Sequence, residues 1–147
     1  MRRILASPTW MLLVTLVGVS AALRSWAGGA VPTPWIAPDE LIYAALGRSL
    51  WSTGHLDLLG NPTSYYSLVY PALAGLPLSL HDHQAGYNLL KALQAVVMSL
   101  TAVPVYLWGR ELVSRGWALV AAALALAPAG LAYSGLIMTE VAFYPLF

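Results

Sequence analysis

Long apolar stretches alternate with short polar ones along this chain. Three of the apolar stretches are long: residues 4–23, 87–108 and 116–136. Lys91 is the one charged residue within these three stretches. About 20 apolar residues in a helix cross the roughly 30 Å hydrocarbon core of a bilayer. We therefore predict three membrane-spanning helices. Apolar sequence resumes from residue 141 to the end, which predicts a truncated fourth span and a chain that is the N-terminal part of one transmembrane domain.

A signal peptide is the alternative for the first apolar stretch. Arg2 and Arg3, the apolar run and the segment 25–27 resemble the three regions of such a peptide. The later apolar stretches favour an anchored first helix instead.

The long segment 24–86 between the first two spans opens on residues 28–34, which are rich in Gly and Pro and cannot continue a helix. Pro38 suits the first position of a new helix, and it places Asp39 and Glu40 in the first turn. The helix dipole favours acidic residues there by about 0.3–1 kcal/mol. This segment therefore predicts a helix that begins with two adjacent carboxylates.

Apolar residues recur at helical spacing from this point to Leu50, and residues 52–54 end the pattern. Such a pattern predicts an amphipathic helix that lies at the membrane interface. A turn signal follows at 60–63. The next apolar piece, 65–80, is interrupted by two prolines, so we predict an interfacial or re-entrant segment rather than a straight span.

Basic residues indicate the orientation of the spans. They stand at 2–3, before the first span, and at 110–115, between the second and third spans. The positive-inside rule places both sites in the cytoplasm and the long first loop outside it. Asp39, Glu40 and Glu140 are then expected on the same outer face of the membrane, although about a hundred residues separate the pair from Glu140.

Composition agrees with a membrane protein. The chain is 59% hydrophobic and 9% charged, whereas soluble domains carry about 25% charged residues. The net charge of +1, with no basic patch, argues against nucleic acid as a partner, and the absence of cysteine excludes disulfides and thiolate metal sites. We predict an all-α, multi-pass membrane protein: a helical bundle with a long extracytoplasmic first loop that contains interfacial helices.

Three neighbouring residues, His81, Asp82 and His83, raise the question of a metal. Alternate side chains of an extended chain point apart, and no third ligand stands at a suitable spacing nearby. A hydrated loop before the second span is therefore our interpretation. We predict no cofactor and leave a divalent metal open.

A resemblance to a known family rests on four segments of the chain: 38–43, 51–56, 65–71 and 137–140. In this arrangement of spans and acids, the chain resembles the GT-C glycosyltransferases, and within them the protein mannosyltransferase and lipid A aminoarabinose transferase branch. Members often have a basic residue before a Pro-Pro pair in the first loop, whereas here a lone Pro71 follows tyrosine. The sugar and the acceptor therefore stay open.

The resemblance implies an inverting transfer of a sugar from a polyprenyl-phosphate donor to an acceptor hydroxyl of a protein, lipid or glycan. It also implies a site that faces outward from the plasma membrane of a prokaryote. Carried over, Asp39 is the base that takes the hydroxyl proton, and Glu40 supports it or contacts the acceptor. The leaving phosphate calls for cationic contacts, for which Lys91 and Arg48 are candidates. Glu140 is a further candidate for substrate binding.

Other interpretations of the same residues stay open. The acidic pair is also what an ordinary helix N-terminus contains, Lys91 is also a suitable interfacial anchor, and Glu140 an ordinary interfacial charge. A transporter or channel component is an alternative function. A truncated, non-catalytic fragment is another.

Overall fold

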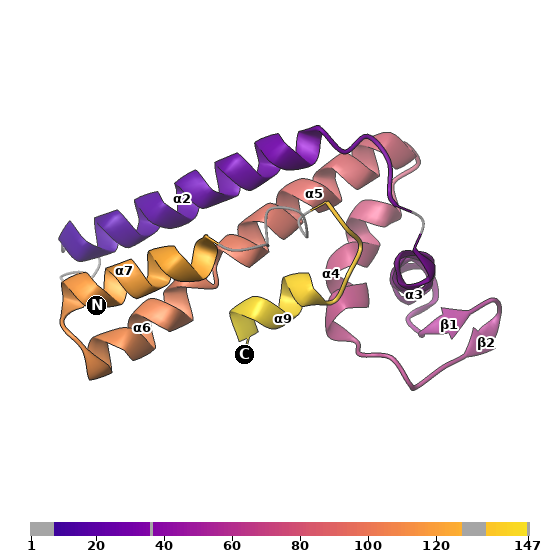
Figure 1. Ribbon diagram of the computed structural model, residues 1–147. Coiled ribbons are helices and arrows are strands. Elements are labelled where there is room, and N and C mark those ends of the chain that lie inside the picture. Colours follow the sequence, from indigo (N-terminus) through magenta and orange to yellow (C-terminus); the bar gives the residue numbers. More distant parts are fainter. Residues whose placement is uncertain (1–7, 36, 128–134, 147) are drawn as a thin grey trace.

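A computed structural model describes residues 8–35, 37–127 and 135–146 of the chain. Most of these residues are helical, and a single two-stranded hairpin lies among the helices (Figure 1). In chain order the elements are α2 (Pro8–Gly29), α3 (Pro38–Thr53), β1 (Asp57–Leu58), β2 (Asn61–Pro62), α4 (Val69–Leu78), α5 (His83–Ser99), α6 (Ala102–Leu112), α7 (Arg115–Leu126) and α9 (Glu140–Leu146).

Within the described part of the chain, two helical runs are long and apolar enough to cross a membrane. One is α2, and the other is the 30-residue run His83–Leu112 that α5 and α6 form together. The two runs pack side by side (Figure 1). Large apolar side chains such as Met11, Leu12 and Val14 point outward from α2, as expected of a helix that faces an apolar medium.

Helical runs long and apolar enough to cross a membrane stand at the first two predicted spans, with shifted ends. Helix α2 continues past the predicted end at residue 23 to Gly29, while residues 4–7 lie outside the described part of the chain. The second predicted span, 87–108, is divided after Ser99. Pro104 causes this break, because it has no N–H to donate to the carbonyl four residues earlier, and Val103 donates to the Leu100 carbonyl instead, at 2.9 Å.

The predicted third span is not one continuous helix to residue 136. Helix α7 ends at Leu126, and Gly135 to Met138 are not helical; the stretch 128–134 lies outside the described residues. The 12 residues of α7 extend about 18 Å, which is short of a hydrocarbon core. Helix α9 begins at Glu140, next to the predicted start of the fourth apolar segment.

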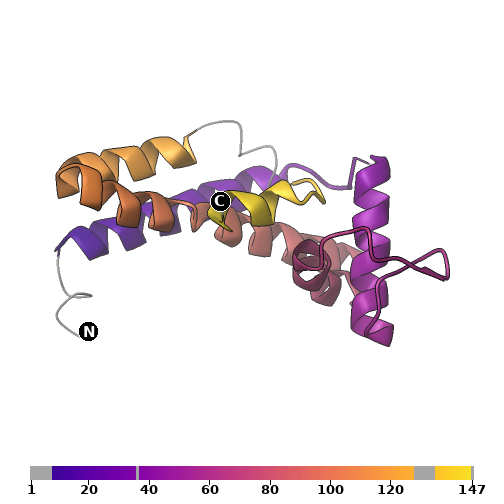
Figure 2. The ribbon, with the colours of Figure 1, turned by 90° about the horizontal axis from the view of Figure 1, so that it is seen from below.

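The segment between α2 and α5 folds into a separate layer at one end of the long helices. Helix α3 begins at Pro38 and ends at Thr53, before Gly54 with φ of 80°, as the sequence predicts. It lies crosswise to α2 and α5 (Figure 2). Helix α4 contains both prolines of the second apolar piece and has only 10 residues, so this piece is indeed not a straight span.

Two glycines let α3 and α4 cross in close contact. A Cβ placed on Gly75 would lie 2.3 Å from the Gly47 carbonyl oxygen and 2.1 Å from Cδ1 of Trp51. The Trp51 indole covers this crossing and donates a hydrogen bond to the Ala72 carbonyl at 2.9 Å. The crossing fixes the angle of α3 against α4, and therefore the place of the acidic pair.

A short hairpin joins α3 to α4. Asp57 pairs with Pro62 and Leu58 with Asn61. Leu59 and Gly60 form its turn with φ of 52° and 81°, which is the left-handed backbone that two-residue hairpin turns require. The sequence pattern predicted a turn here but not the two strands.

Two apolar clusters hold the described residues together. One lies between α2, α6 and α7 and includes Leu13, Tyr106 and Ala118. The other lies where α4, α5 and α9 meet and is made of Tyr70, Ala74, Leu78, Tyr87, Leu90, Met98, Ile137, Val141 and Ala142. The second cluster packs against α3 and so supports the helix that begins with the acidic pair.

Candidate functional site

The two carboxylates of the acidic pair point in different directions. Neighbouring residues of a helix are about 100° apart around its axis. Asp39 is exposed on the outer side of α3, whereas Glu40 is turned inward and is 1% exposed. The pair therefore supplies one accessible acid and one buried acid, a distinction that the sequence pattern does not make.

Both oxygens of Glu40 accept hydrogen bonds from backbone amides. Oε2 accepts from Ala37 N–H at 3.2 Å, and Oε1 accepts from Ile137 N–H at 3.0 Å. The bond to Ala37 is the acidic half of a helix capping box. The bond to Ile137 joins α3 to a segment 97 residues further along the chain.

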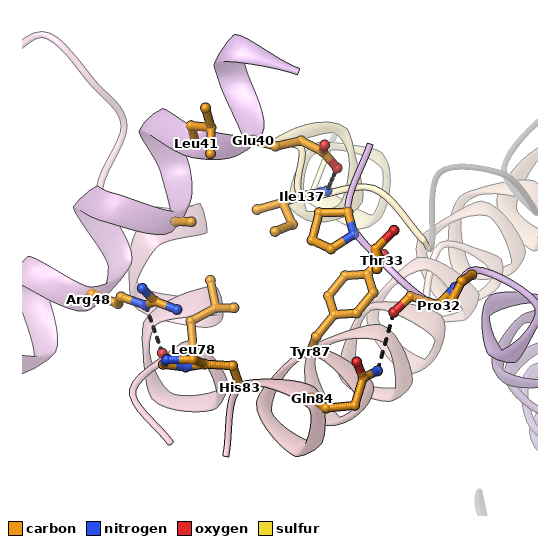
Figure 3. A pocket seen from close by; sticks show the side chains of 12 residues that line it. Pro32, Thr33, Glu40, Leu41, Arg48, Leu78, His83, Gln84, Tyr87 and Ile137 are labelled. Carbon is orange, nitrogen blue, oxygen red and sulfur yellow. Dashed lines mark hydrogen bonds between the residues drawn. The ribbon is translucent and has the colours of Figure 1, made fainter. Parts of the chain in front are cut away.

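A cavity of about 310 Å³ lies beside Glu40, between α3, the end of α4 and the start of α5 (Figure 3). The linker that follows α2 also forms part of the cavity wall. It is lined by Pro32, Thr33, Pro34, Glu40, Leu41, Ala44, Arg48, Leu78, His83, Gln84, Tyr87 and Ile137. The walls are mostly apolar, and a few polar groups converge on the space, which is the usual composition of a small-molecule site.

Arg48 is the cationic group of this cavity. Its Nε donates to the Leu78 carbonyl at 2.9 Å, near the end of α4, where helix carbonyls lack partners. The side chain is exposed, so its terminal nitrogens face the cavity and solvent. Across the cavity, Gln84 Nε2 donates to the Pro32 carbonyl at 3.3 Å and fixes the linker (Figure 3).

Lys91 lies away from the cavity and is already engaged. Its ammonium donates to the Gly28 carbonyl at 3.0 Å and to the Val31 carbonyl at 2.7 Å, and it lies 4.5 Å from the centre of the Tyr87 ring. The side chain is 5% exposed. It binds the Gly28 carbonyl in the last turn of α2, which also accepts from Val31 N–H at 3.1 Å, and the Val31 carbonyl of the linker that follows. With its ammonium engaged in this way, the geometry does not favour the predicted contact to a substrate phosphate.

Side chains also hold the irregular segment before α9. Tyr87 Oη donates to the Gly135 carbonyl at 2.7 Å, and Gln94 Nε2 donates to the Leu136 carbonyl at 3.0 Å. Together with the bond from Ile137 N–H to Glu40, three consecutive residues each have a side-chain partner. The segment thus has a defined course although it is not helical.

Glu140 begins α9 a few residues after this segment. It is half-buried, and Thr139 Oγ1 lies 3.5 Å from its Oε2. Burial raises the pKa of Tyr70 above its usual range, and the charges of Glu40 and Glu140 raise it further. Glu140 does not line the cavity.

Four residues of this arrangement, Gln84, Tyr87, Gln94 and Ile137, were not identified from the sequence as part of a site. Ile137 stands in segment 137–140, which carries the resemblance, but no local pattern assigns a contact to any of the four, because their partners are far away in the chain. Among the described residues, no group of three or more His, Asp or Glu side chains is arranged to hold a metal ion. Asp82 instead caps α5, where its Oδ1 accepts from the N–H groups of Gln84 and Ala85 at 2.9 and 3.1 Å.

Comparison of the chain with protein-family models, with curated proteins and with solved structures finds no match.

Proposed function

We propose that this chain belongs to a membrane glycosyltransferase that moves a sugar from a polyprenyl-phosphate donor to an acceptor hydroxyl at the extracytoplasmic face of the membrane. One observation carries the proposal. An exposed carboxylate, Asp39, begins a helix that lies across the ends of two span-length apolar helices, and Glu40 and Arg48 of the same helix line a cavity that Asp39 itself does not line. A lipid-linked donor brings its sugar to this level of a membrane.

Asp39 is the general base in this proposal. The acceptor oxygen attacks the anomeric carbon of the donor, its proton passes to the Asp39 carboxylate, and the bond from the anomeric carbon to the phosphate oxygen breaks. The polyprenyl phosphate leaves as an anion and needs no proton from an acid. A positioned base of this kind typically contributes about 10²–10⁴-fold to the rate.

Arg48 is the favoured contact for the leaving phosphate. Among the described residues its Nε is bound, to the Leu78 carbonyl, and the two terminal nitrogens can bind two phosphate oxygens. A guanidinium matches phosphate in this bidentate way better than an ammonium does. Lys91, with its bonds to two carbonyls, is left to a structural role.

The test is a transfer assay with the full gene product in membrane vesicles and a panel of radiolabelled polyprenyl-phosphate sugars. Asp39→Asn should abolish transfer without loss of membrane insertion. Glu111→Gln is the matched control, because Glu111 is an exposed acid on α6, remote in sequence from the cavity. Full activity of Asp39→Asn would remove Asp39 as the base. No transfer by the wild type from any donor of the panel would refute the function itself.

The transporter alternative has less support. The described helices α2 and α5 contain no Asp or Glu, and transporters that move ions or protons often use acids within their spans. Solute uptake into vesicles that contain the protein, in the absence of any sugar transfer, would favour this alternative over the enzyme.

A further inference from the structure

We infer that Glu40 is a positioning residue, which fastens the start of α3 to the segment before α9 and so holds Asp39 and Glu140 in a fixed relation. The fastening is a property of the fold. Its consequence for sugar transfer rests on the proposed function. Glu40 would then act through Asp39 rather than on the substrate.

The hydrogen bonds of Glu40 carry this inference. One oxygen binds the amide of Ala37 and the other binds the amide of Ile137, at 3.2 and 3.0 Å. Bonds from amides to an ionised carboxylate are stronger than those between neutral groups. Both oxygens are engaged by the backbone and the residue is only 1% exposed, so its contacts favour a structural role.

Side chains of α5 also bind the segment that Glu40 holds. Ile137 follows two residues whose carbonyls are bound by Tyr87 and Gln94 of α5. Gln94 in turn accepts a hydrogen bond from Tyr70 of α4 at 2.5 Å. Helices α4 and α5 therefore hold one side of the segment, while Glu40 alone among these side chains ties it to α3 (Figure 3).

This tie also forms part of the cavity wall. Glu40 and Ile137 both line the cavity that contains Arg48. If the bond between them were broken, the start of α3 could move away from Ile137, and Asp39 and Arg48, which share this helix, would move relative to Glu140. The rate of transfer depends steeply on such placement, because a misplacement of about 1 Å can cost about 100-fold.

Two variants separate the effect of the hydrogen bond between Glu40 and Ile137 from the effect of the negative charge of Glu40. Glu40→Gln keeps the length of the side chain, but its NH₂ group faces a backbone N–H and loses one of the two bonds. Glu40→Asp keeps the charge but is one methylene shorter, so it cannot reach both amides. Glu111→Gln again serves as the control.

The experiment combines hydrogen exchange and transfer kinetics on the full gene product in lipid nanodiscs. We expect the Ile137 amide to exchange about tenfold faster in both Glu40 variants, which corresponds to a loss of about 1.4 kcal/mol in the local opening equilibrium. We expect kcat to fall by about tenfold or more with KM changed less than about threefold. The control should match the wild type in both measurements.

Each outcome decides a different point. If the Ile137 amide exchanged at the wild-type rate in both variants, the inference that Glu40 fastens α3 to this segment would be refuted. Faster exchange with unchanged kcat would show that the tie exists but does not position the reacting groups, which overturns the inference for catalysis. Faster exchange in a protein whose wild type transfers no sugar would support the tie and refute the proposed function.

Discussion

Replacement of Gly75 by alanine tests the close crossing of α3 and α4. The new Cβ would lie 2.1 Å from Cδ1 of Trp51, 2.3 Å from the Gly47 carbonyl oxygen and 2.8 Å from the Gly47 carbonyl carbon. Two of these three contacts are with backbone atoms, which cannot move aside alone. The two helices must therefore separate.

The expected cost follows from three contributions. Overpacking of a well-packed site costs about 1–3 kcal/mol. Displacement of Trp51 weakens its hydrogen bond to the Ala72 carbonyl, which contributes about 1 kcal/mol. Alanine in place of glycine favours the helix by about 1 kcal/mol. The net destabilisation of Gly75→Ala should therefore be about 1–3 kcal/mol.

The assay is unfolding in mixed micelles titrated with SDS, followed by tryptophan fluorescence. Gly18→Ala is the matched control, because Gly18 is inside α2 and a Cβ there would meet nothing within 4 Å. Alanine at this position should leave stability unchanged or raise it by up to about 1 kcal/mol. If Gly75→Ala proved as stable as Gly18→Ala, the close crossing would be refuted.

Two further predictions concern the C-terminal end of α2 and the orientation of the chain. Lys91→Met should lower the free energy of unfolding by about 2–3 kcal/mol, because the carbonyls of Gly28 and Val31 lose a charged donor; the same SDS titration measures it, and a wild-type value would contradict the capping role. A cysteine at Asn61, in the exposed hairpin, should react with an impermeant thiol reagent in whole cells, whereas one at Ser114, between α6 and α7, should not. Reversed labelling would overturn the predicted orientation.

Local sequence signals were sufficient for the elements around the site. Pro38 and Gly54 mark the two ends of α3, since a proline is suited to a first helical turn and a glycine to the left-handed residue after the last one. The residues from 28 to 34 end α2 for similar reasons. The apolar composition predicted the two span-length helices. All of these features depend on neighbours within a few residues.

Only the tertiary structure decided what the charged residues do. In the fold, Glu40 faces inward and Asp39 is exposed. The Lys91 ammonium donates hydrogen bonds to carbonyls 60 and 63 residues earlier in the chain. The Glu40 carboxylate accepts a hydrogen bond from an amide 97 residues later. A buried charge must find hydrogen-bond partners wherever the fold brings them. Those partners are backbone groups, which every residue has, so no residue type in the sequence marks them.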